Sequence, residues 1–215
     1  MAHLLRIDAS LRKEGSLSRS VADTFQNAWQ LAHPTGTVTV RDLGREPLPY
    51  LTWEGYTARL VPDAERRPEQ RAAVARSAAL VDELLAADAI LLAVPLYNWG
   101  TPASVKTWLD YLFSDPRTRD PEGLLRGRTA VLVNAQGGSY QPGTPRDGWD
   151  HAEPYLRRVL AEVLGLDLLV ITPELTLAEV NPALAQFIEN HRASLAEAHD
   201  TAATAARELA GQLAA

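Results

Sequence analysis

The sequence predicts a three-layer α/β domain built around a doubly wound, five-stranded parallel sheet. Short apolar segments alternate along all 215 residues with longer segments of helical periodicity, five of each. The inner apolar segments, such as residues 90–94, lack polar alternation, which is typical of strands buried on both faces of a parallel sheet. Parallel neighbours need right-handed crossovers, so helices are expected on both faces, within one domain spanning residues 1–215.

The amino-terminal part is expected to contribute two strands and a helix. Residues 3–8 form the first strand, and the helix after it begins near Ser18 or Ser20 and ends near His33. Residues 37–43 alternate and are rich in β-branched side chains, which indicates a second strand at the sheet edge.

Residues 44–67 form a long irregular segment with three prolines and the aromatic residues Tyr50, Trp53 and Tyr56. Long loops inside a compact domain tend to carry function. A helix is predicted over residues 68–86. The side chains expected to form its buried face are Val74, Ala78, Val81 and Leu85.

The centre of the chain joins a buried strand to a helix through a polar, aromatic turn. The strand is expected to stop at Pro95, because proline cannot continue a central ladder. Thr101 is the expected N-cap, and Pro102 suits the first helical turn. The apolar side chains that follow at helical spacing are Val105, Trp108, Leu109, Leu112 and Phe113.

The carboxyl-terminal part is expected to complete the sheet. After a charged loop over residues 114–127, strands are predicted at 129–134 and 167–172, separated by a helix over 154–164. From residue 182 the chain is rich in alanine and is predicted to be helical to its end.

Composition excludes several classes of function. With 46% hydrophobic and 22% charged residues and a net charge of −6, nucleic acids and anionic membranes are disfavoured as partners. The chain has no cysteine, which excludes disulfides, thiolate nucleophiles and cysteine-ligated metals. No apolar run approaches the ~20 residues of a membrane span, and the first residues resemble a strand rather than a signal peptide. We therefore expect a cytoplasmic protein without a metal site.

Three unusual turns follow the first, third and fourth predicted strands, whose carboxyl ends meet at one edge of the sheet. The first, residues 10–18, offers Ser10, Ser16 and Ser18 beside Gly15 and a helix start. Main-chain N–H groups at a helix N-terminus suit a phosphate. The turn matches neither a dinucleotide-binding nor an ATP-binding glycine motif. Taken alone, an ordinary surface turn with a serine N-cap is the better explanation of this segment.

The second turn, residues 96–100, places Asn98 between Tyr97 and Trp99. An amide side chain both donates and accepts, which matches the edge of a uracil-like ring, and the aromatic side chains offer surface for stacking. The third turn, residues 136–140, has paired glycines that let main chain approach a ligand closely. Each turn alone is compatible with simple packing. Together they predict a phosphate site and a planar-ring site on one edge, a combination that FMN fits.

These residues resemble the FMN-dependent NADH-azoreductases, a flavodoxin-like family also described as NADH:quinone oxidoreductases. The resemblance covers nearly the whole chain, and its most specific part is the Pro-x-Tyr-Asn turn after the third strand. The matching segments are Ser10 with Ser16–Ser18, Val40–Leu43, Pro95–Trp99, Lys106 with Asp110, Pro121–Leu124 and Gln136–Gly138.

The resemblance implies strand order 2-1-3-4-5 and a homodimer with FMN at the subunit interface. It also implies a two-electron ping-pong reaction, in which NADH or NADPH reduces the flavin, which then reduces a quinone or an aromatic azo compound. The residues implied for the phosphate are Ser10, Ser16, Leu17 and Ser18. Those implied for the flavin ring are Pro95, Leu96, Tyr97, Asn98, Trp99, Gln136, Gly137, Gly138 and Tyr140.

The chain departs from the family pattern at several positions. Ala135 stands where a serine or threonine is usual, and Leu17 where a glutamine is common. The loop after Phe113 looks shorter than usual, which bears on substrate range.

No residue is a certain catalytic group, because the reaction would pass through the cofactor. Tyr140 is a candidate proton donor, although solvent could supply the proton. Trp53, Tyr56 and Trp149 are candidates to line the substrate site, with core or dimer packing as the alternative for each. A flavodoxin-type electron carrier and a flavin-based redox sensor are the competing functions. The long aromatic segment 44–67 argues against a simple carrier, which needs no substrate pocket.

Overall fold

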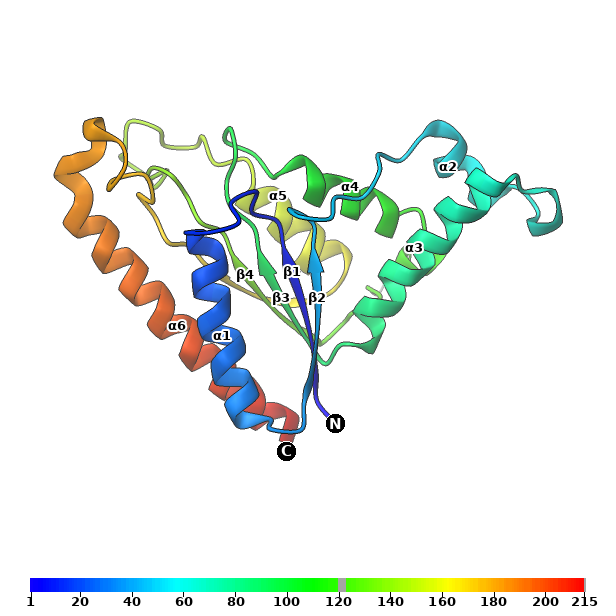
Figure 1. Ribbon diagram of the computed structural model, residues 1–215, viewed down its shortest axis with the longest axis horizontal. Helices are drawn as coiled ribbons and strands as arrows, with labels where there is room; N and C mark the ends of the chain where they lie inside the picture. Colours follow the sequence, from blue (N-terminus) through cyan, green and yellow to red (C-terminus); the bar gives the residue numbers. More distant parts are fainter. Residues whose placement is uncertain (120–122, 215) are drawn as a thin grey trace.

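The computed structural model describes residues 1–119 and 123–214. In this part of the chain five parallel strands form one sheet in the order β2-β1-β3-β4-β5, which confirms the predicted fold class and strand order (Figure 1). The strands are β1 (His3–Asp8), β2 (Thr37–Asp42), β3 (Ala89–Ala93), β4 (Thr129–Val133) and β5 (Asp167–Ile171). Each boundary lies within one or two residues of the predicted one.

Helices cover the two faces of the sheet. On one face lie α1 (Leu17–Ala32) and α6 (Ile188–Ala214), whose Phe25, Trp29 and Ala202 pack with Leu4 and Leu91 of the strands. On the other face lie α3 (Pro68–Ala86), α4 (Ala103–Leu112) and α5 (Glu153–Arg157), which continues as a π-helix over Arg158–Val163.

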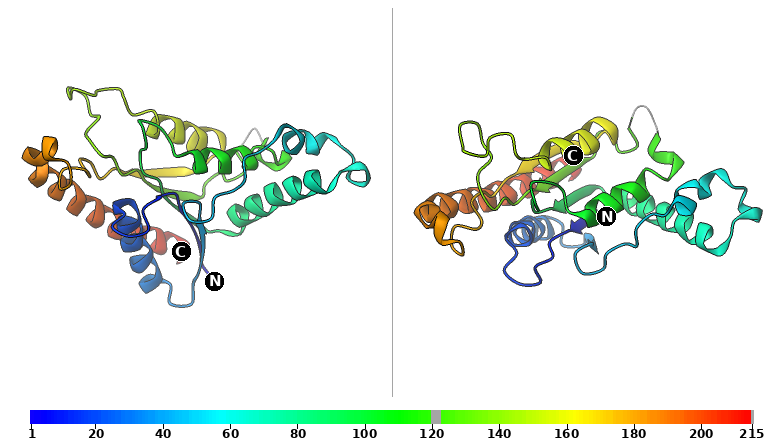
Figure 2. Two further views of the ribbon diagram at one scale, coloured as in Figure 1. Left: turned by 45° about the horizontal axis from the view of Figure 1, so that its top comes forward. Right: turned by 90° about the horizontal axis from the view of Figure 1, so that it is seen from above.

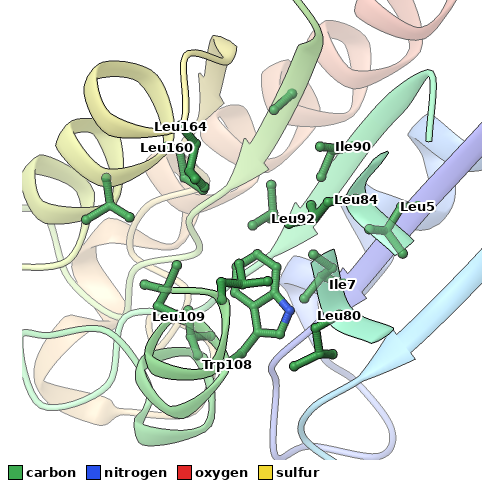
Figure 3. Close-up of a cluster of buried hydrophobic side chains, with 14 of the residues drawn as sticks. Leu5, Ile7, Leu80, Leu84, Ile90, Leu92, Trp108, Leu109, Leu160 and Leu164 are labelled. Atoms are coloured by element: carbon green, nitrogen blue, oxygen red, sulfur yellow. The ribbon is translucent and has the colours of Figure 1, made fainter. Parts of the chain in front are cut away.

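The core between the sheet and the second helical layer is the larger of the two. Leu5, Ile7, Ile90 and Leu92 point from the strands toward Trp108 of α4, as Figure 3 shows. Because consecutive strand residues point to opposite faces, Leu4 and Leu91 enter the other core. Strand β3 is therefore apolar on both faces, as the absence of polar alternation in residues 90–94 predicted.

Helix α1 begins at Leu17, next to the predicted start near Ser18, because the side chain of Ser16 accepts a hydrogen bond from the N–H of Arg19 and caps the helix. Two other local predictions were wrong in detail. Helix α4 is preceded directly by Pro102, so Thr101 is not its N-cap. Of the four residues expected on the buried face of helix α3, Val81 is buried, whereas Val74, Ala78 and Leu85 are half-buried. Its buried residues are Gln70, Ala73, Ser77, Leu80, Val81 and Leu84.

The segment expected to be irregular, residues 44–67, contains the short helix α2 (Trp53–Thr57) and two single 3₁₀ turns, Ala58–Leu60 and Asp63–Glu65. Figure 2 shows it projecting from one side of the sheet, away from the start of α6. The loop after Phe113 contains a 3₁₀ turn, Pro116–Arg119. Residues 120–122, and with them part of the Pro121–Leu124 match, lie outside the described residues. Another 3₁₀ stretch, Pro182–Phe187, leads into α6. None of the described helices is long and apolar enough to cross a membrane.

The large core makes a direct prediction. Replacing Leu109, which is 0% exposed, by alanine should lower the free energy of unfolding by about 2–5 kcal/mol, because it leaves a cavity among packed side chains. The same replacement at Leu31, which is 83% exposed on α1, should change it by less than about 0.5 kcal/mol. Urea unfolding of both variants measures the difference. Equal losses would show that Leu109 is not part of a close-packed core.

Candidate functional site

The three predicted turns lie side by side, because β1, β3 and β4 are neighbours in the sheet. Hydrogen bonds join the turns directly. The N–H of Leu11 donates to the hydroxyl of Tyr97 at 3.1 Å, which links the first turn to the second. The N–H of Leu96 donates to the carbonyl of Ala135 at 2.8 Å, which links the second to the third. The three turns therefore meet at one edge of the sheet, as the sequence predicted.

The first turn presents the N-terminus of α1. Ser10, Ser16 and Ser18 are each more than nine-tenths buried, and the Oγ atoms of Ser16 and Ser18 are 3.3 Å apart. The Oγ of Ser10 accepts from the N–H of Arg12 at 3.3 Å. The first N–H groups of a helix have no partner within it, so Leu17 and Ser18 can offer main-chain donors to an anion.

A buried network of charges supports this turn. Arg19, in the first turn of α1, donates to Asp8 at 2.7 Å, to both oxygens of Asp42 at 2.7 Å, and to the carbonyl of Ser10 at 2.8 Å. Arg6 donates to the other oxygen of Asp8 at 3.0 Å. Arg19 thus bonds directly to Ser10, and Asp8 of β1 and Asp42 of β2 fix the position of its guanidinium group.

Two features fix the end of β2 against the same turn. Burial opposes ionisation of the Asp42 carboxyl, but hydrogen bonds from Arg19 and from the N–H groups of Arg45 and Gly44 outweigh it, so the pKa of Asp42 is lowered. At Gly44 a Cβ atom would lie 2.2 Å from the carbonyl oxygen of Ser10, so only glycine allows this approach.

The second turn is tighter than the sequence indicated. Tyr97 and Gly100 exchange two main-chain hydrogen bonds of 3.0 Å, and the residues between them, Asn98 and Trp99, have φ values of 49° and 62°. Two left-handed residues inside such a bridge correspond to a type I′ turn. Asparagine tolerates this conformation, whereas for Trp99 it costs about 1–2 kcal/mol.

The third turn is held from both sides. The side-chain amide of Gln136 is buried and donates to Asn134 Oδ1 at 3.1 Å and to Asp150 Oδ2 at 2.7 Å. At Gly137 a Cβ atom would lie 2.8 Å from Leu177 Cδ1, so a larger residue there would displace the end of this partly exposed side chain. At Gly138 the nearest side-chain atom to an added Cβ is the hydroxyl oxygen of Tyr140, at 3.8 Å.

Of the three aromatic candidates for the substrate site, Trp149 alone is close to these turns. Its ring meets the ring of Trp99 edge-on, with centroids 5.3 Å apart. Trp53 and Tyr56 belong to α2, which Figures 1 and 2 place on the opposite side from the third turn. They line a cavity of about 380 Å³ together with Asp110 and Phe113. Within one chain, Trp53 and Tyr56 do not line the surface formed by the three turns.

A second hollow, a groove of about 610 Å³, opens beside the first turn. It is bordered by the charged network, by Val40 of β2 and by Gln26 of α1, and it includes no residue of the second or third turn. It therefore runs along the sheet edge rather than across the three turns.

Sequence reasoning found the turns and missed what supports them. Arg6 and Asp8 are two residues apart in β1, so both side chains point to the same face of the strand. The pattern did not indicate that Arg19 and Asp42, distant in the sequence, would complete a buried network. The only local sign was the presence of charges in a strand expected to be central.

Comparisons with known proteins agree with this architecture. A family model described as flavodoxin-like fold matches residues 2–201. An FMN-dependent NADH:quinone oxidoreductase of Frankia casuarinae is 45% identical over 201 residues, which are 92% of this chain and 95% of that protein. Another, of Streptomyces avermitilis, is 43% identical over 217 residues, covering 100% of both.

Solved structures with the same fold include an azoreductase from Bacillus anthracis str. Sterne, with a TM-score of 0.82 and 25% identity over 97% of this chain and 100% of that one. An FMN-dependent NADH-azoreductase from Bacillus anthracis str. Ames Ancestor, in complex with FMN, has a TM-score of 0.78 at 20% identity. It covers 95% of this chain and 99% of that one.

The charged network makes a prediction about pH. Because the pKa of Asp42 is lowered in the folded state, its contribution to stability is complete above about pH 4, the pKa of a free aspartate, and is lost as the pH falls through the folded value. Asp42→Asn should therefore lower the free energy of unfolding by about 1–3 kcal/mol at pH 7 and should flatten its decline at acid pH.

Urea unfolding at pH 7 and across the acid range measures both effects. The matched control is Asp63→Asn, because the Asp63 side chain is exposed and its pair with Arg66 lies at the surface. An Asp42→Asn variant that keeps the acid slope of the unchanged protein would contradict the assigned role of the network.

Proposed function

The chain belongs to the family with the flavodoxin-like fold, and on that premise we propose that it is an FMN-dependent NADH:quinone oxidoreductase that also reduces aromatic azo compounds. The observation that carries the proposal is the row of three hydrogen-bonded turns on one sheet edge, in a chain more than 40% identical to such oxidoreductases over nearly its whole length. The names of these relatives do not favour an electron carrier or a redox sensor.

The first turn fits the phosphate of FMN. We propose that the main-chain N–H groups of Leu17 and Ser18 hold it at the N-terminus of α1, with the hydroxyls of Ser10, Ser16 and Ser18 as further partners. The Oγ of Ser16 already accepts the capping hydrogen bond of α1, so its contribution to phosphate binding is smaller than its sequence position suggested. Leu17 needs only its N–H group for this role, so the absence of a glutamine there is no obstacle.

The second and third turns fit a flat ring. We propose that Asn98, exposed in its type I′ turn, donates to and accepts from the ring edge, and that Pro95, Leu96, Tyr97 and Trp99 line it. The proposed partners at the other edge are the main chain of Gln136, Gly137 and Gly138, and Tyr140. The side chain of Gln136 points inward to Asn134 and Asp150, so it positions this turn.

When bound, FMN supplies two-electron chemistry, accepting hydride from NADH and reducing the quinone or azo acceptor. The chain contributes by binding and orienting the reactants. Tyr140 is the proposed proton donor to the acceptor, because its hydroxyl lies beside Gly138 in the third turn. NADPH as an alternative donor stays a prediction.

The assignment of Asn98 can be tested with two variants. The purified protein should be yellow and should carry about one FMN per chain. Asn98→Ala should weaken FMN binding about tenfold, because it removes hydrogen bonds to the ring. Asn98→Gly keeps the left-handed turn and also removes the amide, so it should lose affinity to a similar extent.

Titration of the flavin-free protein with FMN, followed by flavin fluorescence, measures both variants. If Asn98→Gly binds FMN as tightly as the unchanged protein, the asparagine serves the turn alone. A colourless protein that does not take up added FMN would contradict the proposed function itself.

We propose that the chain acts as a homodimer, in which the segment 44–67 packs against the partner. This segment projects from the sheet and exposes Trp53 at 73% and Leu60 at 71%, with Tyr50 and Tyr56 also exposed. Exposed apolar surface of this kind marks an interaction site. Because α2 lies far from the turns of its own chain, a partner could use these aromatic residues for its substrate site.

The dimer is tested by replacing the exposed apolar side chains. Trp53→Ser combined with Leu60→Ser should shift the protein from about twice 23.5 kDa toward the monomer mass in sedimentation experiments, because both replacements remove apolar contact area. The control is Leu31→Ser, at an exposed apolar residue of α1. A monomeric unchanged protein, or a double variant that stays dimeric, would contradict this role for the segment.

A further inference from the structure

The segment between the third turn and α5 is docked onto the second turn. The N–H of His151 donates to the carbonyl of Trp99 at 2.9 Å, and Trp149 meets Trp99 with ring planes at 78°. Asp150, in the same segment, accepts from Gln136 and caps α5 through the N–H groups of Ala152 and Glu153. The segment is therefore held in place beside the turn assigned to the flavin ring.

Arg146 lies over this pair of tryptophans. Its guanidinium carbon is 5.9 Å from the centroid of each ring, a distance at which a cation is attracted to an aromatic face. Arg146 is exposed, and the two rings are 40% and 47% exposed, so all three groups can be reached from solvent.

The guanidinium keeps its capacity to bind an anion. Among the described residues, no ion pair involves Arg146. The carboxylates beside it in sequence have other partners, since Asp147 accepts from the N–H of Gly143 at 3.1 Å and Asp150 is engaged as described above. An arginine offers planar, paired N–H donors that match carboxylate, sulfonate and phosphate groups.

We propose that Arg146, Trp99 and Trp149 form a subsite for the anionic group of a reactant bound at the flavin ring. The subsite rests on the proposed function, because Trp99 belongs to the turn assigned to the ring. The tryptophans offer surface to a flat aromatic body, and Arg146 pairs with a negative substituent at its end. Two reactants have this chemistry: an acceptor with a sulfonate or carboxylate group, and the dinucleotide donor with its two phosphates.

Two quinones that differ in charge separate this role from a structural one. The acceptors are 1,4-naphthoquinone-2-sulfonate and the neutral 2-methyl-1,4-naphthoquinone, used with the FMN-loaded enzyme and NADH. In Arg146→Gln the ratio of kcat/KM for the sulfonate to kcat/KM for the neutral quinone should fall about tenfold. Arg146→Lys keeps the charge and should restore part of the ratio. Arg207→Gln, on α6, is the control at an arginine away from the turns.

Single-turnover reduction by NADH distinguishes the two sources of the anion. A rise in the apparent Kd for NADH in Arg146→Gln, with an unchanged acceptor ratio, assigns the subsite to the phosphates of the donor and supports the proposal. A changed acceptor ratio with unchanged NADH binding assigns it to the acceptor and also supports it. If the acceptor ratio and NADH binding both stay unchanged, Arg146 binds no reactant and the proposal is wrong.

Measuring the binding of the sulfonated quinone directly tests the subsite without relying on enzyme activity, which is the test of the proposed function. Quenching of tryptophan fluorescence by 1,4-naphthoquinone-2-sulfonate, titrated into the FMN-loaded protein, reports binding without turnover. The expected result is about tenfold weaker binding in Arg146→Gln and a dependence on salt that the variant loses. Equal binding of the sulfonate in both proteins, together with unchanged NADH binding, overturns the subsite. Absent turnover with either quinone in the unchanged enzyme overturns the proposed function instead.

Discussion

The arrangement of the candidate site depends on one buried cation. Arg19, on α1, bonds to Asp8 and to the carbonyl of Ser10 at the end of β1 and to Asp42 at the end of β2, so it joins α1 to both strand ends. Removing charges from water is costly, and a buried pair is maintained only where geometry and further hydrogen bonds are favourable. Here both conditions are met, because Arg6 shares Asp8 and main-chain N–H groups share Asp42. The turn that presents the helix N-terminus is therefore held by its surroundings, in a position where its free N–H groups can meet an anion.

Hydrogen bonds connect this fixed turn to the second and third turns along the same edge of the sheet. Tyr97 accepts from the first turn, and Leu96 donates to the third, so the three turns cannot move independently without breaking these bonds. The left-handed conformation of Trp99 is tolerated because two main-chain bonds close the turn around it and His151 bonds to its carbonyl. A surface with these links is organised before a ligand arrives, which reduces the ordering that binding requires.

The sequence was sufficient for the sheet and for the turns, because both depend on local patterns. Runs of apolar residues mark buried strands, and serine, asparagine and glycine mark turns. It was insufficient where distant segments decide the outcome. The helical periodicity of α3 fitted more than one face, and only packing selected the stripe that contains Ala73 and Leu80. The type I′ turn was not visible, because a tryptophan is an unusual residue in it. Ala135, which stands where the family has a hydroxyl, joins the third turn to the second through its main-chain carbonyl, a contact that does not depend on its side chain. The position of Trp53, far from the turns of its own chain, could not be inferred from its place in the sequence.

The structure divides the site into two kinds of parts. The groups assigned to the phosphate and to the ring lie in turns that hydrogen bonds join to one another, and they combine main-chain N–H groups with the hydroxyls of the first turn and the amide of Asn98. The groups that face an incoming reactant are exposed side chains, namely Trp99, Trp149 and Arg146, together with the aromatic residues of the segment 44–67. Exposed side chains contribute little to the stability of a fold. They are consequently the positions at which the choice of reactant can change while the flavin site keeps its form, and selectivity in this protein is best sought there.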